Sequence, residues 1–167
     1  MAAGKALYAQ RKYVEAARIF NSVDTDSALY NAAMSRAAAG HDAHALLLWT
    51  RYLEVAPDDE RAEVQESIDT ARRLTVEVQF ARSADAAGPR TLVLQAAQHL
   101  SADELRVAWP EGQATLRVSL DPGQWSAALE GAKDGPRSLR VHVERGEPLV
   151  FDLAPELPLS PVRLRLN

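Results

Sequence analysis

Cysteine is absent from this chain of 167 residues, and lysine is scarce, with three lysines against sixteen arginines. A chain without thiols cannot form disulfide bonds, and it cannot build zinc or iron–sulfur sites on cysteine ligands. The lack of cysteine leaves the cellular compartment undecided, because many secreted proteins also lack it.

Long apolar runs and a strong charge of one sign are also missing. The longest apolar run, around Ala45–Trp49, is far shorter than the roughly 18–20 residues that span a bilayer, and the residues after Met1 hold no apolar core of a signal peptide. The formal net charge of −4 is shared equally by residues 1–74 and 75–167. Neither half has the basic excess of a nucleic-acid-binding domain, so we expect neither membrane insertion nor nucleic-acid binding in this segment.

The composition changes sharply near residue 74. Residues 1–74 contain one proline, two glycines and 17 alanines, whereas residues 75–167 contain eight prolines, six glycines and nine of the 13 valines. Alanine favours helices, valine favours strands, and closely spaced proline and glycine mark turns. The sequence therefore predicts an α+β chain with a helical domain at 1–74 and a β domain at 75–167.

Apolar residues recur at helical spacing through the first domain. Asp26 or Ser27 is expected to cap the third helix, and Gly40 to follow it in a left-handed conformation. The acidic run Asp58–Glu60 is expected to open the fifth helix at the positive end of its dipole. The pattern predicts helices at about 2–10, 13–22, 27–39, 42–56 and 58–73.

Two segments of this domain share a spacing of small and large residues. The first reads Gly4-x-Ala6-Leu7-Tyr8, then Tyr13-x-x-Ala16-x-x-x-Phe20, and the second reads Leu29–Ala33, Gly40, Ala45, Trp49 and Pro57. Small residues let two helices cross closely, while large rings fill the space beside them. The spacing resembles the tetratricopeptide repeat (TPR). The matching Gly4 and Ala33 are 29 residues apart instead of about 34, so the first copy is shortened.

This resemblance implies helical hairpins whose first helices form an inner face that binds peptides. Rings there supply contact area, and an amide supplies hydrogen bonds to a peptide backbone. The alternative is that some of these side chains pack on the neighbouring helix. Two repeats and a capping helix fall short of the usual three, so we expect either a fragment of a longer protein or cover from the β domain. On this chain the expected partner-binding residues are Lys5, Tyr8, Tyr30, Asn31 and Met34.

The second half alternates apolar and polar residues with a period of two. Turn signals such as Asp121-Pro122-Gly123 separate the alternating segments. Regular alternation predicts sheets with one face in solvent, hence an antiparallel β-sandwich, Ig-like or PEGA-like. The expected strands lie at about 76–80, 92–94, 105–109, 116–120, 125–129, 139–143, 149–153 and 162–166.

Part of this half shares a short pattern with known sandwiches. Leu120–Trp125 followed by Leu139–Val143 is similar to PEGA and carboxypeptidase-regulatory-like domains, and Pro110–Ala114 resembles the PEGA motif with Gln113 inserted. The resemblance covers about residues 103–153 and implies a bacterial envelope module that adheres or spaces without catalysis. Periplasm or cell envelope is therefore the preferred location, with the cytoplasm as the alternative.

The motif His41-Asp42-x-His44 is the sharpest candidate for chemistry. Two imidazoles on one helix face, with the carboxylate, could hold zinc or nickel. The preferred interpretation is a loop leading into a helix, with Asp42 as the N-cap and both histidines in solvent.

The remaining candidates have simpler interpretations. Ser101–Glu104 fits a capping box at a brief helical turn better than a nucleophile with its carboxylates, and His142 is expected to face outward on its strand. His99 is isolated. No nucleophile elbow, phosphate loop or dinucleotide fingerprint occurs. We therefore expect no catalytic residue, no cofactor and no metal ligand.

The three tryptophans, Trp49, Trp109 and Trp125, are in phase with apolar neighbours, so we expect them in the core and not on an aromatic platform for a sugar.

The leading hypothesis is a non-catalytic protein–protein interaction or scaffold module from a larger bacterial envelope protein. One alternative is a carbohydrate- or peptidoglycan-binding module that uses the β half. The other is a metal-binding protein or enzyme centred on His41 and His44.

Overall fold

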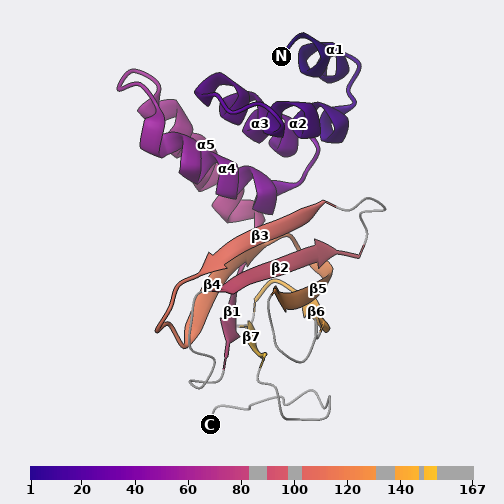
Figure 1. The fold of residues 1–167 in the computed structure, drawn as a ribbon, viewed down its shortest axis with the longest axis vertical. Helices are drawn as coiled ribbons and strands as arrows, with labels where there is room; N and C mark the ends of the chain where they lie inside the picture. Colours follow the sequence, from indigo (N-terminus) through magenta and orange to yellow (C-terminus); the bar gives the residue numbers. More distant parts are fainter. Residues whose placement is uncertain (83–89, 98–102, 131–137, 147–148, 154–167) are drawn as a thin grey trace.

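The chain is α+β, with five helices followed by two β-sheets. The computed structural model describes residues 1–82, 90–97, 103–130, 138–146 and 149–153 (Figure 1). No described helix is both long and apolar enough to cross a membrane. The helices are α1 (Ala2–Ala9), α2 (Tyr13–Asn21), α3 (Asp26–Ala38), α4 (Asp42–Val55) and α5 (Arg61–Leu74).

The helix ends follow local sequence in part. Gly40, just after α3, has φ +73°, the left-handed conformation that the sequence predicts. The cap of α3 is neither Asp26 nor Ser27 but Thr25, whose hydroxyl accepts a hydrogen bond of 3.2 Å from the N–H of Ala28. The acidic run before α5 forms a turn, so the helix begins at Arg61, three residues later than expected.

Small residues hold the helices close together. Four alanines are completely buried: Ala16, Ala32, Ala33 and Ala45. For Ala16 and Ala45 this burial agrees with the prediction that small residues lie where two helices cross. Trp49 is buried beside them as predicted. Because alanine adds little beyond the backbone, helix axes can approach at the short end of the usual 8–10 Å, and neighbouring rings fill the remaining space.

The β half contains seven strands among its described residues, in two sheets. One sheet has the order β4-β1-β7 and the other β3-β2-β5-β6. The expected strand at 162–166 lies outside the described residues. The strands are β1 (Val76–Ala81), β2 (Arg90–Ala96), β3 (Glu104–Trp109), β4 (Thr115–Leu120), β5 (Gly123–Glu130), β6 (Ser138–Val143) and β7 (Leu149–Asp152).

One strand pair departs from the antiparallel prediction. β7 runs parallel to β1, with Val78 opposite Leu149 and Phe80 opposite Phe151, whereas the other four pairs are antiparallel. β6 stops at Val143, opposite Gly123 at the start of β5, and Arg145 just after it donates a hydrogen bond of 3.1 Å to the carbonyl of Leu74, the residue at the end of α5. β7 therefore starts at the end of the sheets where β6 stops, which is also where β1 starts.

Both sheets contribute to one hydrophobic core. Phe80 and Leu120 from the first sheet and Leu92, Trp109 and Trp125 from the second are each at most 1% exposed. The burial of both tryptophans is as predicted. His142 faces outward with 58% of its side chain exposed, also as predicted.

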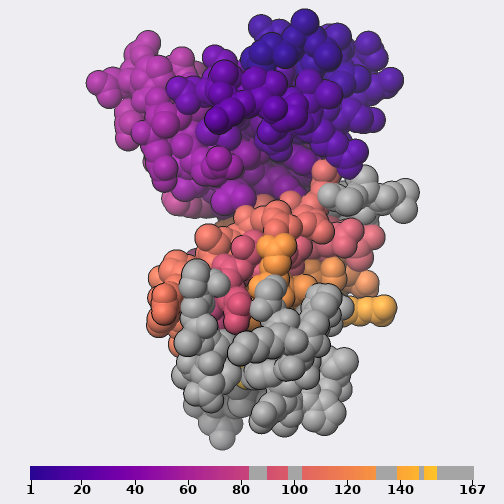
Figure 2. Space-filling model, viewed as in Figure 1, coloured from indigo at the N-terminus to yellow at the C-terminus, as the bar shows by residue number. Residues whose placement is uncertain are grey.

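The helices lie over one end of the strands (Figures 1 and 2). Only Thr75 separates α5 from β1, so the first strand starts at this end. Val76 at the start of β1 pairs with Leu120 at the end of β4, and Ala96 at the end of β2 pairs with Trp125 near the start of β5. This end of both sheets therefore faces the helical half.

Gly4→Ala tests the close approach of α1 and α2. A Cβ at Gly4 would lie 2.6 and 2.7 Å from ring carbons of the buried Phe20. At a solvent-exposed helix position, glycine to alanine stabilises a protein by about 1 kcal/mol. Here the methyl group would collide with the Phe20 ring, so we expect the free energy of unfolding to fall by about 1–3 kcal/mol. Urea denaturation measures the change. Adding Phe20→Leu makes room for the methyl group, so the double variant should lose less stability than the two single losses combined; simple additivity would contradict the packing argument.

Candidate functional site

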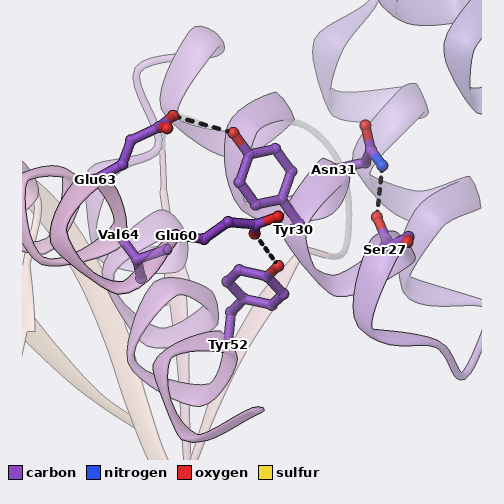
Figure 3. A pocket seen from close by; sticks show the side chains of 7 residues that line it. All are labelled: Ser27, Tyr30, Asn31, Tyr52, Glu60, Glu63 and Val64. Atoms are coloured by element: carbon purple, nitrogen blue, oxygen red, sulfur yellow. Dashed lines mark hydrogen bonds between the residues drawn. The ribbon is translucent and has the colours of Figure 1, made fainter. Parts of the chain in front are cut away.

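A pocket of about 360 Å³ lies among α3, α4 and the start of α5 (Figure 3). We call it the α3–α5 pocket. Its walls carry two rings, two carboxylates, an amide and a hydroxyl, and one aliphatic side chain. The lining residues are Ser27, Tyr30, Asn31, Tyr52, Glu60, Glu63 and Val64.

The Tyr30 ring is held by other aromatic rings. Its centroid lies 5.1 Å from that of Trp49 and 5.3 Å from that of Tyr52, both in edge-to-face contact. Such contacts add about 0.5–1.5 kcal/mol each to the effect of burial. Tyr30 is thus a fixed wall of the pocket. The sequence left open whether Tyr30 contacts a partner or packs on a neighbouring helix. The ring packs on α4 and also lines the pocket.

Both tyrosine hydroxyls donate hydrogen bonds to glutamates. Tyr52 donates to Oε2 of Glu60, and Tyr30 donates to Oε1 of Glu63 at 3.3 Å (Figure 3). The hydrogen bond to Glu60 and burial raise the pKa of Tyr52 to about 12. Burial, followed by the charge of Glu63, raises the pKa of Tyr30 above its ordinary value of 10.0. Burial and the neighbouring glutamates contribute to both shifts.

The five residues expected to bind a partner do not form one cluster. Tyr30 and Asn31 line the α3–α5 pocket. Met34 follows one turn later on α3 and is 37% exposed. Lys5 is exposed on α1, and Tyr8 is half-buried with its ring 5.1 Å from that of Tyr13, so neither lines the pocket.

Sequence reasoning assigned only Tyr30 and Asn31 of the lining residues to partner binding, and it missed the other five: Ser27, Tyr52, Glu60, Glu63 and Val64. Tyr52 lies three residues after Trp49 on α4 and is buried, with its hydroxyl bound to Glu60. The two glutamates are three residues apart, a spacing that places side chains on one helix face. That spacing could have indicated a pair of carboxylates on one face. It could not indicate that α3 brings Tyr30 beside them, because that contact forms only in the folded chain.

A second cluster joins the helices to the sheets. We call it the helix–sheet joint. It includes charged, aromatic and small side chains from both halves: Arg18, Arg36, His41, Ala43 and His44 from the helices, with Asp103, Asp121 and Trp125 from the β half.

The expectation that both histidines of the His41-Asp42-x-His44 motif lie in solvent is wrong. Each is only 6% exposed. The His44 ring stacks on Trp125 with centroids 6.5 Å apart and an interplanar angle of 24°. Nδ1 of His41 lies 3.2 Å from Nη1 of Arg36. The β half covers this surface, which no local pattern in the sequence indicates.

Asp103 binds two arginines across the joint. Its Oδ2 accepts a hydrogen bond of 2.9 Å from Nη1 of Arg36, and its Oδ1 accepts one of 3.0 Å from Nε of Arg18. Burial alone would raise the pKa of Asp103, but the two guanidinium groups outweigh it and hold the pKa at about 2. The adjacent Glu104 begins β3, so the helical turn expected at Ser101–Glu104 is wrong at that residue. Ser101 lies outside the described residues.

Asp121 caps α4 from the other half of the chain. Its Oδ1 accepts a hydrogen bond of 3.0 Å from the N–H of Ala43. Asp42, the expected N-cap, is instead the first helical residue, and no side chain within the helix supplies the cap. Burial raises the pKa of Asp121 to about 6, with a smaller contribution from Asp42, against the opposing effect of the Ala43 N–H.

Neither cluster gathers enough candidate ligands to hold a metal ion among the described residues. The described residues contain no group of three or more histidine, aspartate or glutamate side chains that could hold a metal ion. His99 lies outside them. Trp109 and Trp125 are buried, so neither ring is free to stack on a sugar.

Comparisons of the chain with family models, with curated proteins and with solved structures found no match. The resemblances to the TPR and to PEGA domains therefore rest on the residues and on the coarse architecture of helices followed by sheets.

Asp121→Asn tests the cap of α4 through its pH dependence. The pKa of Asp121 is higher in the folded chain than its ordinary 3.8, so its contribution to stability is full below pH 3.8 and is lost as the pH rises through about 6. Asparagine keeps the acceptor and stays neutral. We expect the variant to match the wild type near pH 4 and to exceed it by about 1–3 kcal/mol at pH 8 in urea denaturation.

Asp121→Ala is the matched control for this cap. It removes the acceptor and leaves the N–H of Ala43 unpaired, so it should be less stable than Asp121→Asn at every pH by about 1–2 kcal/mol. Parallel pH profiles for the wild type and Asp121→Asn would contradict the role assigned to the buried carboxylate.

Proposed function

We propose that this protein is a non-catalytic protein-binding module, with TPR-like hairpins that hold a peptide segment of a partner. In this proposal the two sheets form an Ig-like or PEGA-like sandwich that supports the hairpins. The observation that carries the proposal is the α3–α5 pocket, because it gathers recognition groups around Tyr30 and Asn31, two of the five residues that the sequence predicts to bind a partner.

The pocket has the chemistry of a peptide-contacting surface. Tyrosine rings give large contact areas at low entropic cost, and they are enriched at interfaces. The amide of Asn31 sits beside them, with its nitrogen donating to the carbonyl of Ser27 and its oxygen available as an acceptor. Met34, one turn further along α3, adds an exposed, adaptable apolar side chain.

The helix–sheet joint supports this proposal by making the binding face rigid. Both halves contribute buried polar groups to the joint, and Ala43 and Leu47 of α4 pack against the core of the sheets. A peptide that binds a preorganised surface loses less affinity to ordering of the protein.

Neither alternative function gains support from a specific contact. The sugar-binding alternative needs an exposed aromatic platform, and the two tryptophans of the β half are core residues. The metal alternative needs a third protein ligand beside His41 and His44, and the described residues supply none.

The proposal is tested by selecting binders from a random 12-residue peptide library against the purified protein. Selected peptides should show saturable binding by fluorescence anisotropy, and Met34→Ser should raise their Kd about 5- to 10-fold, equivalent to about 1–1.4 kcal/mol. Tyr30→Ala is a poorer test of binding than Met34→Ser, because the Tyr30 ring also packs on Trp49 and Tyr52.

Val150→Ser on β7 is the matched control, since it makes a similar apolar-to-polar change at a side chain that is 56% exposed and lies in the β half. It should leave Kd unchanged. A library that yields no binder, or binders insensitive to Met34→Ser, would refute the helical face as the binding site.

A further inference from the structure

The α3–α5 pocket contains two carboxylates and no cation. Neither lysine nor arginine lines it, and among the described residues Glu60 and Glu63 form no ion pair. Other carboxylates do have basic partners: Asp103 binds two arginines, and Asp69 pairs with Arg72 further along α5. No basic side chain of the described residues therefore compensates the negative charge of the pocket.

The pocket walls also preorganise these carboxylates. One hydrogen bond from a tyrosine hydroxyl positions each carboxylate, and each carboxylate keeps further lone pairs for another donor. Tyr30 is held in turn by its edge-to-face contacts with Trp49 and Tyr52. Two oriented acceptors beside a fixed aromatic ring form a site with little freedom left to lose when a ligand binds.

This combination selects for a cationic ligand group. A carboxylate pair accepts charge-assisted hydrogen bonds from a guanidinium, and a tyrosine ring attracts a cation to its face. An anion would be repelled by both glutamates. An apolar group would desolvate them without providing a partner, which is costly.

We propose that the α3–α5 pocket binds a basic side chain, above all arginine, in the peptide that this module recognises. This inference rests on the proposed function and names the chemistry of the partner. Glu60 and Glu63 would bind the guanidinium, while Tyr30 and Tyr52 orient the two carboxylates. Met34 would contact a flanking apolar residue of the same peptide.

The direct test is a titration of the full chain with N-acetyl-arginine amide, followed by two-dimensional ¹H–¹⁵N NMR. The control probe is N-acetyl-citrulline amide, which has nearly the same shape without the charge. We expect saturable shifts at the backbone amides of Tyr30, Glu60 and Glu63, with millimolar affinity for the arginine probe and at least tenfold weaker binding of citrulline. Equal shifts from both probes, or no saturable shift with arginine, would overturn the inference.

The double variant Glu60→Gln/Glu63→Gln keeps acceptors for the tyrosines and removes the charge. It should weaken binding of the arginine probe at least tenfold. The charge-matched control is Glu54→Gln/Glu66→Gln, two exposed glutamates outside the pocket, which should bind as the wild type does. Melting curves and NMR spectra of the free variants check that each is folded.

The peptide library separates this inference from the proposed function. Enrichment of arginine or lysine among binders that are sensitive to both Met34→Ser and Glu60→Gln/Glu63→Gln supports the inference. Binders that depend on Met34 but lack basic residues and ignore the glutamate changes would overturn the inference while leaving the helical face as a binding site.

Discussion

One buried carboxylate, Asp103, ties two helices to the β half. Asp103 stands just before β3 and binds Arg36 of α3 and Arg18 of α2, so a single residue of the β half connects two helices. Arg36 is only 4% exposed, and an ion pair at that depth cannot be broken cheaply, because removing one partner leaves a buried charge at a cost of about 3–5 kcal/mol. The two halves are therefore held in one arrangement by charge as well as by apolar contact.

Helix α4 connects the helix–sheet joint to the α3–α5 pocket. Asp121 caps the N-terminus of this helix, and Tyr52 lines the α3–α5 pocket nine residues after Ala43, about 13 Å further along the helix. Because an α-helix is stiff over that length, the sheets set the direction of α4, and α4 sets the place of the Tyr52 hydroxyl and its partner Glu60. The pocket is thus built by helices but oriented from the β half.

Local chemistry explains most of what could be predicted. Alternation and helical spacing placed each helix and each described strand within a few residues, because burial repeats every 2.0 or 3.6 residues whatever the partner is. The same reasoning predicted the core positions of Trp49, Trp109 and Trp125. It failed where the partner lies far away in the sequence: the cap of α4, the parallel pairing of β7, and the burial of His41 and His44. The cap of α3 was missed by one residue, because Thr25, Asp26 and Ser27 are all residues that can cap a helix.

By itself, the sequence determined an α+β chain, the change from helices to strands near residue 74, the small residues at helix crossings and the absence of any thiol chemistry. Each of these depends on residue type and short-range periodicity. Only the tertiary structure decided that Asp121 caps α4, that Asp103 neutralises Arg36, and that Tyr30 faces Glu63 across two helices. Those contacts join residues 33 to 78 positions apart, and the direction of a side chain at such separations is set by how whole elements pack.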